Sequence, residues 1–157
     1  MTPEEKRETY ERVRREIAAV LEGERHPITM MSTINCLLAE AFPYYYWTGF
    51  YLVDPERPDE LIVGPYQGTL GCLRIPFGKG VCGAAAATGE IQIVPDVHAF
   101  PGHIACDSRS NSEIVLPVRD RDGRLIAVFD VDSTDFGSFD AIDAEGLLRI
   151  LEDSFSR

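Results

Sequence analysis

YYWTGFYLV at residues 45–53 and ELIVGPY at residues 60–66 are rich in the aromatic and β-branched residues that favour β-strands. The residues between them, DPERPD at 54–59, are dominated by Asp and Pro, which favour turns. Two strand-like segments joined by so short a turn predict an antiparallel hairpin. We therefore expect an antiparallel sheet built around this hairpin.

Two helices are expected before the hairpin. Thr2 is a suitable N-cap for a helix whose first turn carries Pro3 and acidic residues, and this helix is expected to run to about Glu22. Apolar residues at helical spacing predict a second helix from Thr29 to Ala41, which Phe42-Pro43 closes. His26-Pro27 separates the two helices.

The second half of the chain alternates short strands with helices and one long loop. Its expected elements, in chain order, are a short helix at 81–87, a strand at 91–94, a long loop at 95–112, strands at 113–118 and 125–132, and a helix at 140–155. The whole order indicates an α+β fold, in which helices pack on one face of a central antiparallel sheet. The other face is then free to carry loops that form a pocket.

Length and charge narrow the classes of protein that fit. The 157 residues suit a single domain, spanning residues 1–157, with one core. A net charge of −11 and a pI near 4.6 repel phosphate backbones, so nucleic acid is not an expected partner. No apolar run is long enough for a membrane helix, and residues 1–22 are too charged for a signal peptide. We expect a cytoplasmic protein with no membrane partner.

Four cysteines are the first candidates for chemistry: Cys36, Cys72, Cys82 and Cys106. Without an export signal they are better interpreted as free thiols, metal ligands or redox groups than as structural disulfides. The thiolate is the reactive form, so a reactive cysteine needs a setting that lowers its pKa and admits substrate. Two positions meet this condition, namely Cys82 in the first turn of the short helix and Cys106 in the polar loop.

The other two cysteines are weaker candidates. Cys36 lies among apolar residues of the second helix, which favours a buried and inert side chain. Reduction by protein thiols needs two cysteines, because one is oxidised and another attacks it to form a disulfide. The thiol of Cys106 with that of Cys72 or of Cys82 meets this need, and the residues alone leave the choice open.

Three acids occupy neighbouring strand ends. Strand alternation places Asp130 and Asp132 on one face, and Glu113 begins the adjacent expected strand. If the three carboxyls are enclosed, like charges raise at least one pKa and provide a proton donor near neutral pH. The simpler interpretation, favoured by the pattern alone, is that these acids face water.

Other motifs predict no metal and no cofactor. The residues in the loop that could ligate a metal have a spacing that matches no common ligand pattern: Asp96, His98, His103 and Cys106. Gly78-Lys79-Gly80 lacks the spacing of a phosphate-binding loop. Trp47 and Tyr51 share one face of their strand, so they either pack in the core or form the wall of a small apolar pocket.

The central block of the chain carries a family resemblance. The run Gly80 to Ala87, continuing through Pro95 to Ser108 and Ser112 to Val115, closely resembles the free methionine-(R)-sulfoxide reductases, which are enzymes built on a GAF domain. The likeness extends from Phe42 to Ser133 and so covers most of the chain. It implies that the α+β fold is a GAF-like domain.

The resemblance assigns roles to three cysteines. It implies that Cys106 is the catalytic cysteine, Cys72 its resolving partner and Cys82 an auxiliary thiol. The implied substrate is free methionine sulfoxide. The thiolate attacks its sulfur, methionine leaves and a sulfenic acid remains, which the resolving cysteine converts to a disulfide. A thioredoxin-like reductant then restores the thiols.

The resemblance also assigns the pocket. Glu113, Asp130 and Asp132 align with carboxylates that bind substrate and supply the proton, and Trp47 and Tyr51 align with the aromatic wall. The (R) preference and the restriction to the free amino acid come from the family alone. Family members are often dimers, so a homodimer is among the oligomeric states left open.

Two other classes of function stay open at this point. A GAF domain also serves as a ligand-binding sensor module, because a fold does not determine a function. The same cysteines also suit a protein that senses peroxide. Neither alternative uses three acids beside the thiols as directly as a sulfoxide reductase does.

Overall fold

The computed structural model describes residues 1–103 and 107–157. Its helices are α1 (Pro3–Val20), α2 (Pro27–Ala41), α3 (Gly80–Thr88), the 3-10 turn η1 (Val97–Ala99) and α4 (Ala141–Phe155). Its strands are β1 (Trp47–Asp54), β2 (Arg57–Gln67), β3 (Arg74–Pro76), β4 (Gln92–Val94), β5 (Ser112–Arg119) and β6 (Leu125–Ser133). The predicted α+β class is confirmed.

All six strands form one antiparallel sheet in the order β3-β2-β1-β6-β5-β4. The predicted hairpin is its β1–β2 pair, and β6 connects β1 to β5. The register places Trp47 opposite Asp132 and Glu113 opposite Asp132. Residues from three strands therefore meet in one row across the middle of the sheet.

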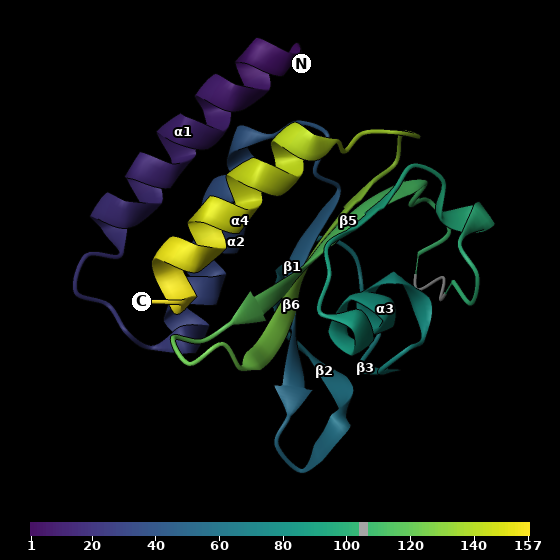
Figure 1. Cartoon of the computed structure of the whole chain (residues 1–157). Helices are drawn as coiled ribbons and strands as arrows, with labels where there is room; N and C mark the ends of the chain where they lie inside the picture. Colours follow the sequence, from purple (N-terminus) through teal and green to yellow (C-terminus); the bar gives the residue numbers. More distant parts are fainter. Residues whose placement is uncertain (104–106) are drawn as a thin grey trace.

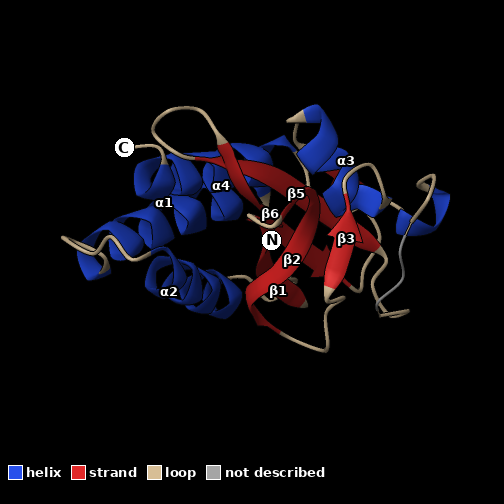
Figure 2. Ribbon diagram, turned by 90° about the horizontal axis from the view of Figure 1, so that it is seen from below, coloured by secondary structure: helices blue, strands red, loops and turns tan. Residues whose placement is uncertain are grey.

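The two faces of the sheet carry different layers (Figure 1). Helices α1, α2 and α4 cover one face, as predicted, whereas α3 lies on the opposite face, which Figure 2 shows from below. Strand alternation divides the buried apolar residues into two clusters rather than the expected single core. One is packed under the three long helices, and the other lies between the sheet and α3.

Local signals explain most element boundaries. Thr2 and Glu5 form a capping box at the start of α1, as the Thr2 signal predicts. Pro27 occupies the first turn of α2, which therefore begins two residues before the predicted Thr29. Gly89, with φ +70°, ends α3 in the left-handed conformation. None of the described helices is long and apolar enough to cross a membrane.

Candidate active site

Three carboxyl groups meet on the face of the sheet that α3 covers. Glu113 lies on β5, and Asp130 and Asp132 lie on β6, where alternation points all three side chains to this face. Glu113 is 6% exposed and Asp130 is 4% exposed, while Asp132 is half-buried. The predicted convergence is confirmed, and the interpretation that these acids face water is wrong for Glu113 and Asp130.

The three carboxyls have no cationic partner in the part of the chain that the structure describes. No ion pair among the described residues involves any of them, and Asp130 Oδ1 is buried without a hydrogen-bond partner there. Burial raises the pKa of Glu113, Asp130 and Asp132 well above the usual values, and the neighbouring carboxylates raise them further. The group therefore retains protons at higher pH than ordinary acids and is suited to donate one.

A small cavity opens beside these acids. Its volume is about 50 Å³, far below the roughly 300–1,000 Å³ of pockets that hold drug-sized ligands. It is lined by residues of the sheet, of α3 and of three loops: Trp47, Tyr51, Leu70, Gly71, Ile75, Lys79, Gly80, Val81, Cys82, His103, Asp107, Ser110, Glu113, Asp130 and Asp132. Such a space suits a small polar molecule rather than a nucleotide-sized cofactor.

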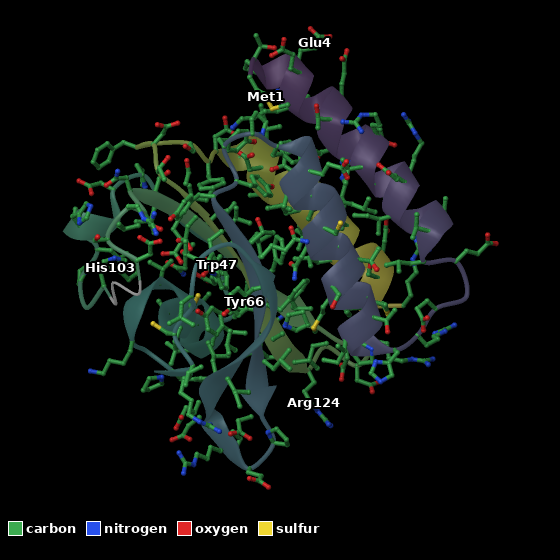
Figure 3. The ribbon with its side chains drawn as sticks, turned by 180° about the vertical axis from the view of Figure 1, so that it is seen from behind. Met1, Glu4, Trp47, Tyr66, His103 and Arg124 are labelled. Carbon is green, nitrogen blue, oxygen red and sulfur yellow. The ribbon has the colours of Figure 1, made fainter. Side chains whose placement is uncertain are left out.

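An aromatic wall borders the cavity on the β1 side. The Trp47 indole stacks on Tyr51, at 5.7 Å between ring centroids, and on Tyr66, at 5.0 Å. Figure 3 labels Trp47 and Tyr66, which lie close together. Its Nε1 donates a hydrogen bond to the Thr69 carbonyl oxygen at 2.8 Å. A Cβ at Gly71 would lie 2.9 Å from the indole, so the close approach of this segment requires glycine. The prediction that Trp47 and Tyr51 share a face is confirmed.

The cysteines differ from the sequence expectations in two ways. Cys82 is buried on α3 beside the acids, and burial with the Asp130 charge raises its thiol pKa, so the expected activation by the helix start is wrong. Cys36 is an exposed free thiol, so its predicted burial is also wrong. Cys72 is half-buried and disulfide-bonded. Cys106 lies outside the described residues.

A hydrogen-bonded carboxylate holds another wall of the cavity, and the sequence did not single it out. Asp107 Oδ2 accepts hydrogen bonds from the Tyr46 hydroxyl at 2.7 Å and the Thr69 hydroxyl at 2.6 Å. The Arg109 guanidinium and backbone N–H also donate to Asp107, and these bonds lower its pKa. Asp107 therefore ties its loop to the segment that supports Trp47. The signal in the sequence that could have suggested this role for Asp107 is its place in the polar loop.

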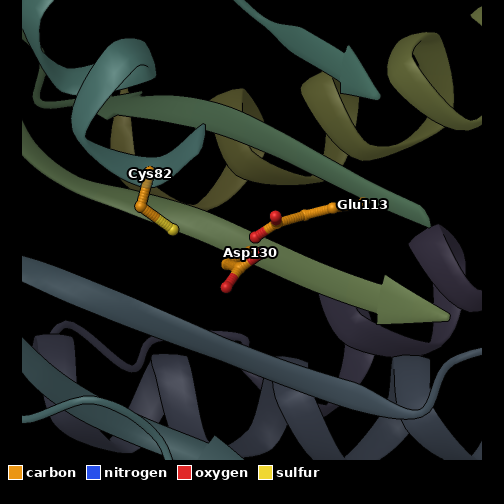
Figure 4. Close-up of side chains that lie close together, drawn as sticks. All are labelled: Cys82, Glu113 and Asp130. Atoms are coloured by element: carbon orange, nitrogen blue, oxygen red, sulfur yellow. The ribbon is translucent and has the colours of Figure 1, made fainter. Parts of the chain in front are cut away.

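The metal set considered from the sequence is not assembled in the described residues. His98 Nε2 bonds to Asn111 Oδ1 at 2.9 Å, and Asp96 caps η1. Among the described residues the group that could hold a metal is instead Cys82, Glu113 and Asp130, whose ligand atoms lie within 4.8 Å of one another (Figure 4).

Residues 39–153 match the family model of the GAF domain, and the chain belongs to this family. The chain is 43% identical to the free methionine-R-sulfoxide reductase of Escherichia coli (strain K12), over 93% of this chain and 86% of that protein. It is 47% identical to GAF domain-containing protein A of Dictyostelium discoideum, over 94% of this chain and 90% of that protein.

A solved structure extends this likeness to three dimensions. The free methionine-R-sulfoxide reductase from Neisseria meningitidis in complex with its substrate has a TM-score of 0.86 and 46% identity, and the match covers 93% of this chain and 87% of that chain. These comparisons confirm the family that the sequence resembles.

Proposed function

We propose that this protein reduces free L-methionine-(R)-sulfoxide to L-methionine. The observation that carries the proposal is the enclosed group of Glu113, Asp130 and Asp132, which has no cationic partner among the described residues. The reductases of Escherichia coli and Neisseria meningitidis, at 43% and 46% identity over most of the chain, support the same activity.

The pocket has groups suited to each part of this substrate. The ammonium group of a free amino acid would be the positively charged partner of the carboxyls and would donate charge-assisted hydrogen bonds to them. The rings of Trp47 and Tyr51 would contact the S-methyl end, since both line the cavity. The restriction to the free amino acid is supported by the relatives named free methionine-R-sulfoxide reductase and by the enclosure of the acids that would bind the ammonium group.

Cys106 is the nucleophile of the proposal. Its thiolate attacks the sulfoxide sulfur while Glu113 or a neighbouring aspartate protonates the oxygen, so that methionine leaves and the cysteine becomes a sulfenic acid. The thiol of Cys72 then displaces water from the sulfenic acid and forms a disulfide. The disulfide-bonded state of Cys72 supports this second step, and Cys82 is left as the auxiliary thiol.

The test is turnover of free L-methionine-(R)-sulfoxide with a small dithiol as reductant. Cys106→Ser is expected to abolish turnover, whereas Cys36→Ser, which removes an exposed thiol, is expected to leave it unchanged. One equivalent of substrate should also produce a mass change of two hydrogens and a Cys72–Cys106 peptide pair. Near-normal turnover by Cys106→Ser would contradict the assignment, and ligand binding without turnover would favour a sensor module.

The setting of the enzyme belongs to the same proposal. A thioredoxin-like protein would supply the electrons, in the cytoplasm, where dithiol donors keep such enzymes reduced. Residues 1–157 would act as one domain, because α1, which precedes the matched residues 39–153, is joined to α4 by the Lys6–Asp143 ion pair. A homodimer would leave this chemistry unchanged.

A further inference from the structure

Cys82, Glu113 and Asp130 form a compact group of metal-ligand types at the floor of the cavity. They come from α3, β5 and β6, and one ligand atom from each lies within 4.8 Å of the other two. Figure 4 shows the sulfur directed toward the two carboxyl groups. All three residues are buried and line the cavity, so a ligand bound there would retain an open side.

A second observation is that one oxygen atom of this group lacks a hydrogen-bond partner among the described residues. Asp130 is only 4% exposed, and its Oδ1 makes no hydrogen bond with any described residue. A buried carboxylate oxygen in this state is costly unless a ligand supplies a donor or a positive charge. The neighbouring carboxyls repel it, and a cation placed between them would remove this repulsion.

The donor types select the kind of cation. One thiolate with two carboxylates suits Zn²⁺ or Cd²⁺, whereas Mg²⁺ and Ca²⁺ need more oxygen ligands. Tetrahedral Zn²⁺ would require ligand atoms about 3.3–3.7 Å apart. Because the present atoms lie within 4.8 Å of one another, shifts of at most roughly 1–1.5 Å would bring them to this geometry. The fourth position would face the cavity, as in zinc sites that keep a place for water or ligand.

We propose that Cys82, Glu113 and Asp130 bind a thiophilic divalent cation, which occupies the cavity and excludes an amino acid from it. On binding, the Cys82 S–H bond breaks, a sulfur–metal bond forms and the proton passes to water. The cation therefore acts as an inhibitor rather than a cofactor. Only the competition with an amino acid rests on the proposed function, because cation binding itself requires no turnover.

The test uses Co²⁺ as a spectroscopic probe in a variant with Cys36→Ser, Cys72→Ser and Cys106→Ser, which retains Cys82 as the only thiol. We expect a near-ultraviolet thiolate-to-cobalt absorption band that Zn²⁺ displaces at one equivalent. Adding Glu113→Gln or Asp130→Asn should weaken Co²⁺ binding about tenfold or more. Saturating free L-methionine should also weaken it.

Two results would overturn the proposal. The first is the absence of a near-ultraviolet band in the variant that retains only Cys82, provided that its urea unfolding midpoint shows a folded protein. The second is a Co²⁺ affinity that neither Glu113→Gln nor Asp130→Asn changes relative to the parent variant. As a control, the Cys36→Ser variant should show the same band as the wild-type protein, since the Cys36 thiol is exposed on α2.

Discussion

Two buried acidic sites lie on opposite faces of the sheet, and they differ in what surrounds them. On the helical face, Asp143 is 0% exposed and accepts hydrogen bonds from Lys6 Nζ at 2.6 Å, Tyr10 at 2.6 Å and the Tyr44 hydroxyl. On the cavity face, Asp130 is almost as buried, yet its Oδ1 has no partner among the described residues.

The difference separates structural from functional burial. The partners of Asp143 belong to α1 and to the segment before β1, so its charge joins elements of the fold. The carboxyls of Asp130, Glu113 and Asp132 have no such cation among the described residues, so their ionisation is unfavourable in the free protein until a cationic ligand binds. Burial alone therefore does not identify a site. On the cavity face, the site is distinguished by three converging acids, an unpaired Asp130 oxygen and an adjoining cavity.

The largest effect is expected on the helical face. Asp143→Asn removes the nearer, fully buried partner of Lys6, which is 7% exposed, and leaves the more exposed Asp140 at 3.5 Å. It should lower the free energy of unfolding by about 3 kcal/mol. Urea unfolding measures this change. The KM of the remaining folded enzyme should stay near the wild-type value, and a stability loss below about 1 kcal/mol would remove the contrast between the two faces.

The cavity face should show the opposite behaviour. Asp130→Asn retains the shape of the side chain, and it removes the ionisable carboxyl whose Oδ1 has no hydrogen-bond partner among the described residues. We expect kcat/KM for the free sulfoxide to fall about 100-fold, because ammonium binding and the proton-donating group are both affected. The free energy of unfolding should stay the same or rise. Loss of stability comparable to that of Asp143→Asn would show that Asp130 is structural.

The pH dependence of stability sharpens the comparison. The pKa of Asp130 is raised in the folded state, so the folded protein binds this proton more tightly, and the resulting stability is lost as pH rises above the ordinary carboxyl pKa of about 4. Asp130→Asn removes this pH-dependent loss of stability. The stability of the variant minus that of wild type should therefore increase between about pH 5 and about pH 8 in urea unfolding. A difference that decreases over this range would contradict the raised pKa.

A smaller effect is expected at Asp107, which is a positioning residue. Asp107→Asn weakens the bonds from Tyr46 and Thr69 that hold the cavity wall, and kcat should fall about tenfold with little change in fold. Thr69→Val should add little to this loss, because both changes break the same contact. Fully additive effects on kcat would show that the two residues act separately.

Much of this arrangement could be predicted from local sequence, because its causes are local. The turn at 54–59 determines the hairpin, and the Asp130-Val131-Asp132 alternation places two carboxyls on one face. Enclosure of these acids could not be predicted, since it depends on α3 packing over distant strands. β3 was missed because three residues carry no measurable periodicity.

The error at Cys36 has a different cause. Its apolar neighbours suggested burial, but the buried face of α2 includes Asn35, which donates to the Pro65 carbonyl oxygen at 2.8 Å. Cys36 is two residues from buried Ile34 and therefore lies on the opposite side of the helix. The buried residues Met30, Ile34 and Leu38 recur every four positions, and this spacing already places Cys36 away from the buried face. The error came from relying on sequence neighbours instead of helical periodicity.

The most direct measurement compares kcat/KM for free L-methionine-(R)-sulfoxide with that for its N-acetyl derivative. If the unpaired carboxyls at the cavity bind the substrate ammonium group, acetylation should lower kcat/KM about 100-fold or more, since it removes the charge and leaves the acids unpaired. Asp130→Asn should reduce this ratio toward one. Equal turnover of both compounds by the wild-type protein would contradict the account.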